Sequence, residues 1–304
     1  MVPIVAAVQA ASGRVARHAS RLLAACLLMS ALGGCAWLEA RQQVLALRPT
    51  AGRPADVAPD AGLRSGDQRY TLPVPGADGS TQQLALWWMP HPDPRAPALL
   101  YLHGTFRNLY KNLPKIDAIR DAGFAVLAVD YRGWGDSTSI VPTEDSINAD
   151  ALLAWAELAR RQSDARRRVV FGHSMGGAVA VTLASGLHRG ADYGALVLES
   201  TFTSLPDVAA EAGLVGRVAA WVTTLEFDSQ SRIGRIDAPL LMLHGSADKT
   251  VPVALGRRLR DAAPPGVQWV EIPGGTHSLL HQEAPDLYRQ ALQQVIQQLE
   301  PAAK

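Results

Sequence analysis

Three polar residues of the chain have the types and the order that acyl transfer requires. Residues Gly172 to Gly176 read GHSMG, which matches the pattern G-x-S-x-G between an apolar run and a stretch of small residues. A serine on such a strand-to-helix turn is held clear of the sheet, where a base can reach its hydroxyl. Asp248 and His277 follow later, each after a further apolar run. The order predicts Ser174 as the nucleophile, Asp248 as the orienting acid and His277 as the general base.

A tetrahedral intermediate also needs N–H donors for its negatively charged oxygen. We expect one donor to be the amide of Met175, which directly follows the serine at the start of a helix. We expect the other to be the amide of Thr105, which follows a His-Gly pair at the end of an earlier apolar run. The amide of Phe106 is the alternative for this second position.

Other residues of the same types compete for these roles. Glu199 also ends an apolar run, which makes it the rival orienting acid, and His281 is the rival base. His103, His173 and His244 each lie beside a glycine at the end of an apolar run. We expect these three histidines to be hydrogen-bonded structural residues.

The elements that must position these residues alternate between strand-like and helix-like segments. Most of the apolar runs lack period-2 alternation, which is typical of strands buried on both faces of a parallel sheet. Between them lie helical patterns, such as 143–161 with Thr143 and two acids at its start, and 284–300 with Pro285 in its first turn. The alternation predicts one doubly wound, mostly parallel α/β sheet with its site at the carboxyl ends of the strands. The predicted strands are QQLALWWMP, PALLYLHG, FAVLAVDYR, RVVFGHS, ALVLES, PLLMLHG and VQWVEIP.

These features together make the chain similar to the α/β-hydrolase superfamily over about residues 70–300. The stretches DYRGWGDS, ESTFTSL and HGSADKTVP are similar to lipase- and thioesterase-like hydrolases with a minimal cap. The resemblance implies a hydrolase of carboxylic esters or thioesters that uses the predicted triad through an acyl-enzyme. Thr105 stands where several relatives have asparagine, a change to which a backbone donor is indifferent. Within DYRGWGDS, we expect Arg132 and Asp136 to pin a loop.

Residues 200–236 lie where hydrolases of this fold often insert a cap, although the insertion is too short for a full lid domain. Leu214, Val218, Trp221 and Val222 share one apolar side of this insertion. Two interpretations remain open, namely packing against the sheet and an apolar lip over the nucleophile that accepts acyl chains.

The N-terminal region predicts export and a lipid anchor. Residues 22–32 form an apolar core behind several arginines, and this core is too short to cross a bilayer. It ends in LGGC, which resembles a bacterial lipobox and implies cleavage before Cys35 and lipid attachment to its sulfur. An ordinary signal peptide is the alternative. The expected organisation is a signal peptide over 1–34, an anchor cysteine with a flexible tether over 35–68, and the hydrolase domain over 69–304.

Composition limits the partners and cofactors. The net charge of +1, with charges of both signs interspersed, gives no reason to expect nucleic acid. No spacing of cysteines, histidines or acids suggests a metal site, and GLVGR lacks the features of a phosphate loop, so no cofactor is expected. Cleavage would remove Cys26 and leave no internal disulfide. We therefore expect a lipid-anchored protein of the cell envelope, in the outer membrane facing the periplasm, that acts on lipid or xenobiotic esters.

Two other functions stay open on the sequence. One is a peptidase of the same fold, similar to proline-type aminopeptidases, which would need an acidic pocket for a free amino terminus. The insertion offers only Glu211, Glu226 and Asp228 for such a pocket. The other is a non-catalytic envelope protein on a hydrolase fold, against which the complete set of three catalytic residue types argues.

Overall fold

A computed structural model describes residues 38–214, 216, 218 and 223–299 of the chain. The chain divides into two compact units, the first ending at Leu45 and the second beginning at Ala46. The described residues of the first unit, 38–45, are helical. Cys26 and Cys35 lie outside the described residues. Within the described residues, no helix is both long enough and apolar enough to cross a membrane.

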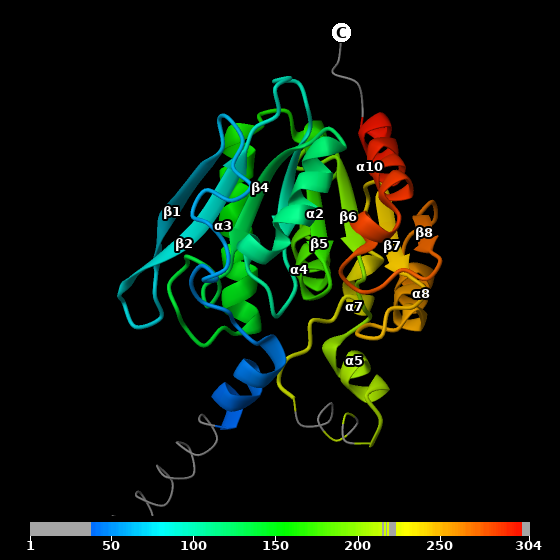
Figure 1. Cartoon of the computed structure of the whole chain (residues 1–304). Coiled ribbons are helices and arrows are strands. Elements are labelled where there is room, and N and C mark those ends of the chain that lie inside the picture. The colour runs from blue at the N-terminus through cyan, green and yellow to red at the C-terminus, as the bar shows by residue number, and fades with distance from the viewer. Residues whose placement is uncertain (1–37, 215, 217, 219–222, 300–304) are drawn as a thin grey trace, which may run out of the picture. The chain divides into compact units, whose positions relative to one another are not determined.

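An eight-stranded sheet runs through the second unit in the strand order β1-β2-β4-β3-β5-β6-β7-β8 (Figure 1). The pairs β1–β2 and β2–β4 are antiparallel, whereas every pair from β4 to β8 is parallel. The predicted doubly wound, mostly parallel sheet is therefore confirmed. The strands are β1 (Gln68–Pro75), β2 (Thr81–Met89), β3 (Ala98–Leu102), β4 (Ala125–Asp130), β5 (Arg168–His173), β6 (Ala195–Glu199), β7 (Leu240–Gly245) and β8 (Gln268–Ile272).

Helices cover both faces of this sheet (Figure 1). One core lies between the sheet and α3, α4 and α8, and the other lies between the sheet and α2 and α10. The described helices are α2 (Leu109–Asp121), α3 (Glu144–Arg161), η1 (Ala165–Arg167), α4 (Met175–Ala184), α5 (Leu205–Glu211), α7 (Gln230–Ile233), α8 (Val253–Ala262), α9 (Leu280–Glu283) and α10 (Pro285–Gln298).

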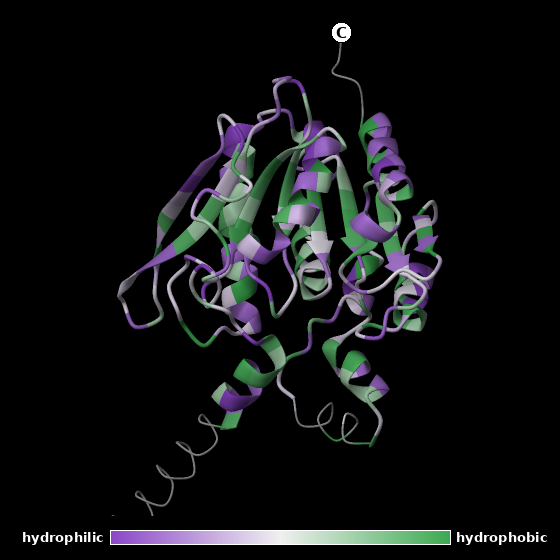
Figure 2. Ribbon diagram, in the orientation of Figure 1, coloured by the Kyte–Doolittle hydropathy of each residue, from purple (hydrophilic) through white to green (hydrophobic). Residues whose placement is uncertain are grey.

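The central strands are apolar at consecutive positions because helices cover both of their faces. In β3, Leu100 and Leu102 point into the first core, while Leu99 and Tyr101 point into the second. All five residues of β3 are buried. Figure 2 shows the same division, with apolar strands in the middle and polar residues on the outer sides of the helices.

Local sequence sets the start of α3 as predicted. The Thr143 hydroxyl accepts a hydrogen bond from the amide of Ser146 at 3.0 Å, and the Ser146 hydroxyl accepts one from the amide of Thr143 at 2.9 Å. This reciprocal capping satisfies two N–H groups that have no partner inside the helix. Glu144 and Asp145 in the first turn add a favourable interaction with the helix dipole.

The second unit begins earlier than the domain boundary expected at residue 69. Leu47 is buried in the core of the unit. The Asn108 side-chain amide donates to the carbonyls of Thr50 and Gly52 at 3.2 and 2.8 Å. Residues from 46 onward thus pack as part of the unit, where the sequence suggested a free tether up to residue 68. A composition rich in proline and glycine predicts a segment without regular secondary structure, but it does not show whether that segment packs against the domain.

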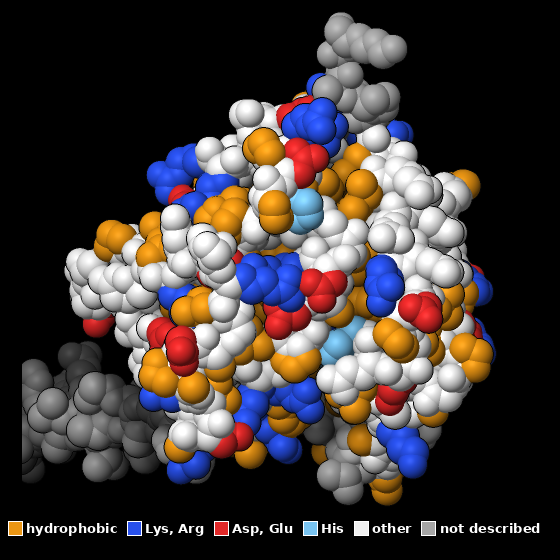
Figure 3. Space-filling view, turned by 45° about the horizontal axis from the view of Figure 1, so that its top comes forward, with side chains coloured by type: hydrophobic (Ala, Val, Ile, Leu, Met, Phe, Trp, Pro, Cys, Tyr) orange, Lys and Arg blue, Asp and Glu red, His pale blue; other side chains and the backbone are white. Residues whose placement is uncertain are grey.

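Basic and acidic side chains are interspersed on the face of the molecule drawn in Figure 3. Exposed ion pairs follow from this mixing, and Arg64, for example, pairs with both Asp117 and Asp121 at 2.9 and 2.8 Å. Such pairs leave a solvated surface of mixed sign and add little to stability.

Candidate active site

The turn between β5 and α4 holds Ser174 in a strained conformation. Its φ is +56° and its ψ is −123°, which few residues with a side chain adopt. The surrounding backbone holds it there, because the Ser174 amide donates to the carbonyl of Glu199 at 2.8 Å and its carbonyl accepts from the amide of Gly177 at 2.9 Å. The turn thus presents the hydroxyl at the carboxyl end of the sheet, as G-x-S-x-G predicts.

The glycines of the GHSMG motif are required by close backbone contacts. A Cβ at Gly172 would lie 2.2 Å from the carbonyl oxygen of Gly176, and one at Gly176 would lie 2.1 Å from that of Leu102. No side chain fits at these distances, so β3, β5 and α4 can approach this closely only with glycine at both positions.

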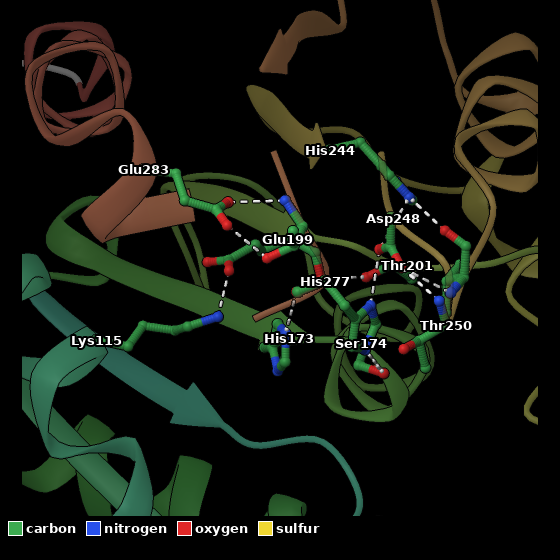
Figure 4. A network of polar contacts seen from close by, with 12 residues as sticks. Lys115, His173, Ser174, Glu199, Thr201, His244, Asp248, Thr250, His277 and Glu283 are labelled. Atoms are coloured by element: carbon green, nitrogen blue, oxygen red, sulfur yellow. Dashed lines mark hydrogen bonds and ion pairs between the residues drawn. The ribbon is translucent and has the colours of Figure 1, made fainter. Parts of the chain in front are cut away.

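The structure brings the predicted nucleophile, base and acid together (Figure 4). The distance from Ser174 Oγ to His277 Nε2 is 2.9 Å, and His277 Nδ1 lies 2.7 Å from Asp248 Oδ2. With the proton on Nδ1 donated to the carboxylate, Nε2 is free to accept the serine proton. The geometry therefore suits nucleophilic attack by a serine that a histidine activates.

The Asp248 carboxylate is fully buried and held on several sides. Its Oδ1 accepts hydrogen bonds from the amides of Thr250 and Val251, both at 2.9 Å. His244 Nε2 lies 3.5 Å from Oδ2 while it donates to the carbonyl of Val251 at 2.9 Å. Burial alone would raise the pKa of Asp248, but the close approach of His244 and the hydrogen bonds from His277 and the Val251 amide outweigh it and hold the pKa well below its usual range. The acid is thus ionised and fixed where it faces the base.

Two side chains hold the loop that carries His277, the predicted base (Figure 4). His173 Nε2 donates to the carbonyl of His277 at 3.0 Å. Burial lowers the pKa of His173 well below its usual range, so this ring is neutral. On the other side of the loop, Glu283 accepts from both the amide and the hydroxyl of Thr276, at 2.7 and 2.6 Å. The loop is therefore anchored at two successive residues, at His277 by His173 and at Thr276 by Glu283.

A pocket of about 320 Å³ opens over the serine and the histidine. Thr105 lines it, and Met175 is the first residue of α4, whose amide has no acceptor inside the helix. These positions suit the two predicted oxyanion donors, whose role remains a prediction. The pocket is lined by Gly104, Thr105, Phe106, Arg107, Asn112, His173, Ser174, Thr250, His277 and Ser278.

Among the described residues, the side chains of the rival acid and the rival base form no hydrogen bond with Ser174 Oγ or with the His277 ring. Glu199 is fully buried, forms an ion pair with Lys115 and accepts from the Tyr288 hydroxyl at 2.8 Å. His281 is buried, and neither of its ring nitrogens has a hydrogen-bond partner within the described residues. Burial lowers the pKa of His281 to about 4.

The remaining polar residues singled out in the sequence have structural contacts. Arg132 Nε donates to Asp150 at 2.9 Å, and Asp136 accepts from the Tyr110 hydroxyl at 2.6 Å. His103 is fully buried and donates from Nδ1 to the carbonyl of Gly104 at 2.6 Å.

The described part of the insertion 200–236 does not line the pocket. Leu214 and Val218 are 78% and 58% exposed, so neither of them packs on the sheet. Trp221 and Val222 lie outside the described residues.

Sequence reasoning missed several contributors to this site. Arg107 and Ser278 line the pocket, Glu283 anchors the loop of the base, and Lys115 neutralises the rival acid. Arg107 could have been found from its position, since it lies two residues after the expected oxyanion donor. The partners of Glu283 and Lys115 are set by the packing of α9 and α2, which no local pattern reveals.

Comparison with known proteins supports the fold from several directions. The family model described as serine aminopeptidase, S33, matches residues 93–229, a range that ends before Asp248 and His277. An uncharacterized protein of Mycobacterium tuberculosis is 35% identical over 201 residues, which cover 64% of this chain and 68% of that protein. The structure of the Pyrococcus furiosus esterase Pf2001 superposes with a TM-score of 0.63 at 20% identity, over 83% of this chain and 97% of the esterase.

A lipase is among the relatives. The lysophosphatidylserine lipase ABHD12 of Danio rerio is 33% identical over 188 residues, which cover 55% of this chain and 47% of the lipase. The chain thus spans about half the length of the first curated relatives it matches.

Proposed function

We propose that this chain, which belongs to the α/β-hydrolase superfamily, hydrolyses carboxylic esters or thioesters through an acyl-enzyme formed on Ser174. The observation that carries the proposal is the hydrogen-bonded series from Ser174 Oγ through His277 to Asp248, at 2.9 and 2.7 Å, at the mouth of a pocket. The lipase among the relatives and the esterase among the structural neighbours support an ester as the substrate.

In the first half of the reaction, Ser174 Oγ attacks the carbonyl carbon while its proton passes to His277 Nε2. The carbonyl π bond opens to an oxyanion, which the amides of Met175 and Thr105 would hold. The ionised Asp248 stabilises the imidazolium. The tetrahedral intermediate then collapses, and the departing alkoxide or thiolate takes the proton from Nε2, which leaves the acyl group on the serine.

In the second half, water enters the vacated side of the pocket and loses a proton to His277 Nε2 as its oxygen attacks the acyl carbon. A second oxyanion forms in the same place. Its collapse breaks the bond to Ser174 Oγ, which regains the proton from the imidazolium. The carboxylic acid leaves and the free enzyme is restored.

Apolar esters of lipid or xenobiotic origin are the substrates that we propose. The volume of about 320 Å³ suits a short acyl chain or the reactive end of a longer one. Phe106, which is 48% exposed, offers an apolar wall at the mouth of the pocket.

A peptidase of the same fold is the competing function, because the family that matches residues 93–229 is that of the serine aminopeptidases, S33. Among the described residues, no Asp or Glu lines the pocket at Ser174. Glu226 and Asp228 line a separate recess with Asp207. A free amino terminus would therefore meet no carboxylate among the described residues of the pocket, which favours esters.

The first test is hydrolysis of 4-nitrophenyl esters of increasing acyl length by the full chain and by Ser174→Ala. Turnover should fall by at least about 10³-fold in the variant, since the nucleophile is lost. Ser185→Ala, at the other end of α4, is the matched control and should keep full activity. Equal turnover by Ser174→Ala would refute the proposal, and cleavage of aminoacyl 4-nitroanilides without any ester turnover would establish the peptidase.

We also propose that the chain is a lipoprotein of the cell envelope, in the outer membrane facing the periplasm. The support is the sequence around Cys35 alone, which lies outside the described residues. Labelling of cells with radioactive palmitate should mark the protein and should fail for Cys35→Ser. Equal labelling of both would rule out an anchor at this residue.

A further inference from the structure

Among the described residues, the pocket over Ser174 has one charged residue in its lining apart from the histidines, namely Arg107. No acidic residue of the described chain lines it. The charge that a substrate meets beside the scissile bond is therefore positive.

Arg107 is exposed, and its guanidinium has no hydrogen-bond or ion-pair partner among the described residues. Its backbone, by contrast, is held, because its amide donates to the carbonyl of Thr105 at 2.9 Å. The two nearby cations of α2 are both neutralised, Lys111 by Asp56 at 2.6 Å and Lys115 by Glu199. Of the charged residues in the described lining of the pocket, Arg107 keeps its full donor capacity, and a guanidinium is well matched to carboxylates and phosphates.

A smaller recess of about 30 Å³ shares Arg107, Asn112 and Ser278 with the pocket and is lined further in by His281. His281 is only 8% exposed, yet no described residue forms a hydrogen bond with either of its ring nitrogens. One of these nitrogens carries a proton, and a buried N–H without an acceptor is costly. Asn112 is already engaged, because its Oδ1 accepts from Tyr101 and its Nδ2 donates to Asn108. Three donors thus line one corner without an acceptor, namely the Arg107 guanidinium, the Ser278 hydroxyl and the His281 N–H.

We propose that Arg107, with Ser278 and His281, binds an anionic group, a carboxylate or a phosphate, that the substrate carries next to its scissile ester. The site deepens, and rests on, the ester hydrolysis proposed above. An anion supplies the acceptors that the three donors lack, and it brings the charge that the unpaired guanidinium attracts. Arg107 then determines specificity by favouring anionic over neutral esters.

Two pairs of substrates place the anion on either side of the ester. On the acyl side, 4-nitrophenyl hydrogen succinate is compared with 4-nitrophenyl pentanoate. On the alcohol side, 1-octanoyl-glycerol 3-phosphate is compared with 1-octanoyl-glycerol. In at least one pair, Arg107→Met should lower kcat/KM for the anionic ester by about tenfold or more and change that for the neutral ester by less than about twofold. The affected pair identifies which side of the substrate carries the anion.

Two further variants separate a local contact from general attraction. Arg107→Lys should recover part of the lost rate, since it keeps the charge without the bidentate geometry. Lys249→Met removes the same charge from an exposed residue that does not line the pocket, and it should leave the anionic-to-neutral ratio unchanged. Equal losses in Lys249→Met and Arg107→Met, or an unchanged ratio for Arg107→Met in both pairs, would overturn the anion site while leaving ester hydrolysis intact.

A binding measurement makes the anion site testable even without turnover. The full chain carrying Ser174→Ala is titrated calorimetrically with 1-O-octyl-glycerol 3-phosphate, whose ether bond cannot be hydrolysed. Binding should weaken about tenfold when Arg107→Met is added. Equal affinity with and without the arginine would rule out an anion site on the alcohol side of the ester, and an unchanged ratio in the succinate pair as well would refute the site altogether. If the unmodified chain hydrolyses no ester but binding still depends on the arginine, the proposed function is refuted and the anion site is not.

Discussion

The buried pair of Lys115 and Glu199 should be strongly coupled in stability and uninvolved in catalysis. Glu199 ends β6 with a fully buried side chain, and Lys115 reaches it from α2 with a side chain that is only 3% exposed. One carboxylate oxygen pairs with the ammonium, and the other accepts from the Tyr288 hydroxyl at 2.8 Å. Removing either charge leaves the other buried without its counter-ion.

The size of the effect follows from this burial. Loss of one partner of a buried ion pair costs about 3–5 kcal/mol, because the remaining charge keeps its desolvation penalty. We therefore expect Lys115→Met and Glu199→Gln each to lower the free energy of unfolding by that amount. The double variant has no buried charge at this place, and its glutamine can still accept from the tyrosine. It should cost about 1–2 kcal/mol, less than either single change.

Urea unfolding at pH 7, followed by tryptophan fluorescence, measures these free energies in the four proteins. Activity with 4-nitrophenyl esters is measured on the folded protein in parallel. Glu199→Gln should keep kcat within about tenfold of the unmodified chain, because Ser174 is held by the Glu199 backbone and not by its side chain. Asp248→Asn should lower kcat by about 10³–10⁴-fold, since it disturbs the tautomer of the base.

Two results would refute this reasoning. If the double variant loses as much stability as the two single variants added together, the effects of the two charges are independent and neither charge compensates the other. If Glu199→Gln lowers kcat as far as Asp248→Asn, then Glu199 orients the base and the role assigned to Asp248 is wrong.

Three further variants test other parts of the site. Gly172→Ala should lower the free energy of unfolding by at least about 3 kcal/mol, because its Cβ would lie 2.2 Å from a carbonyl oxygen. The control Gly186→Ala, whose Cβ would lie 3.7 Å from its nearest atom, should change the melting temperature little. Equal melting temperatures for the two variants would contradict the close contact at Gly172. Glu283→Ala should lower kcat about threefold to tenfold with little change in KM, because Thr276 then loses both of its hydrogen bonds to the carboxylate. An unchanged kcat would show that the loop needs no such anchor. Burial lowers the pKa of His281 to about 4, so between about pH 6.5 and 4 the unfolded chain binds a proton that the folded chain does not. The free energy of unfolding is therefore full above this range and falls by up to about 3 kcal/mol as the pH drops through it. His281→Gln should remove this loss, as measured by urea titrations at each pH.

The parts of the molecule that could be predicted from sequence are those set by neighbours along the chain. The strands of the central sheet are short apolar runs because both of their faces are covered, and this pattern is visible without any structure. The cap of α3 and the proline at the start of α10 likewise depend on adjacent residues. The placement of Ser174, Asp248 and His277 follows from the same logic, since parallel strands bring their carboxyl ends to one edge.

The parts that could not be predicted depend on contacts between elements distant in sequence. Glu199 and Asp248 both follow apolar strands and look alike in the sequence, yet Lys115 on α2 neutralises the first while His244 and two loop amides fix the second beside the base. A helix packed one turn differently would leave Glu199 unpaired and would change its chemistry without changing a single local motif. The same holds for Arg107: its position close to Thr105 is local, but that its guanidinium has no counter-ion among the described residues depends on the whole fold. Catalytic residue types can therefore be read from the chain, whereas the charge that a substrate meets depends on which cations the packing leaves unpaired.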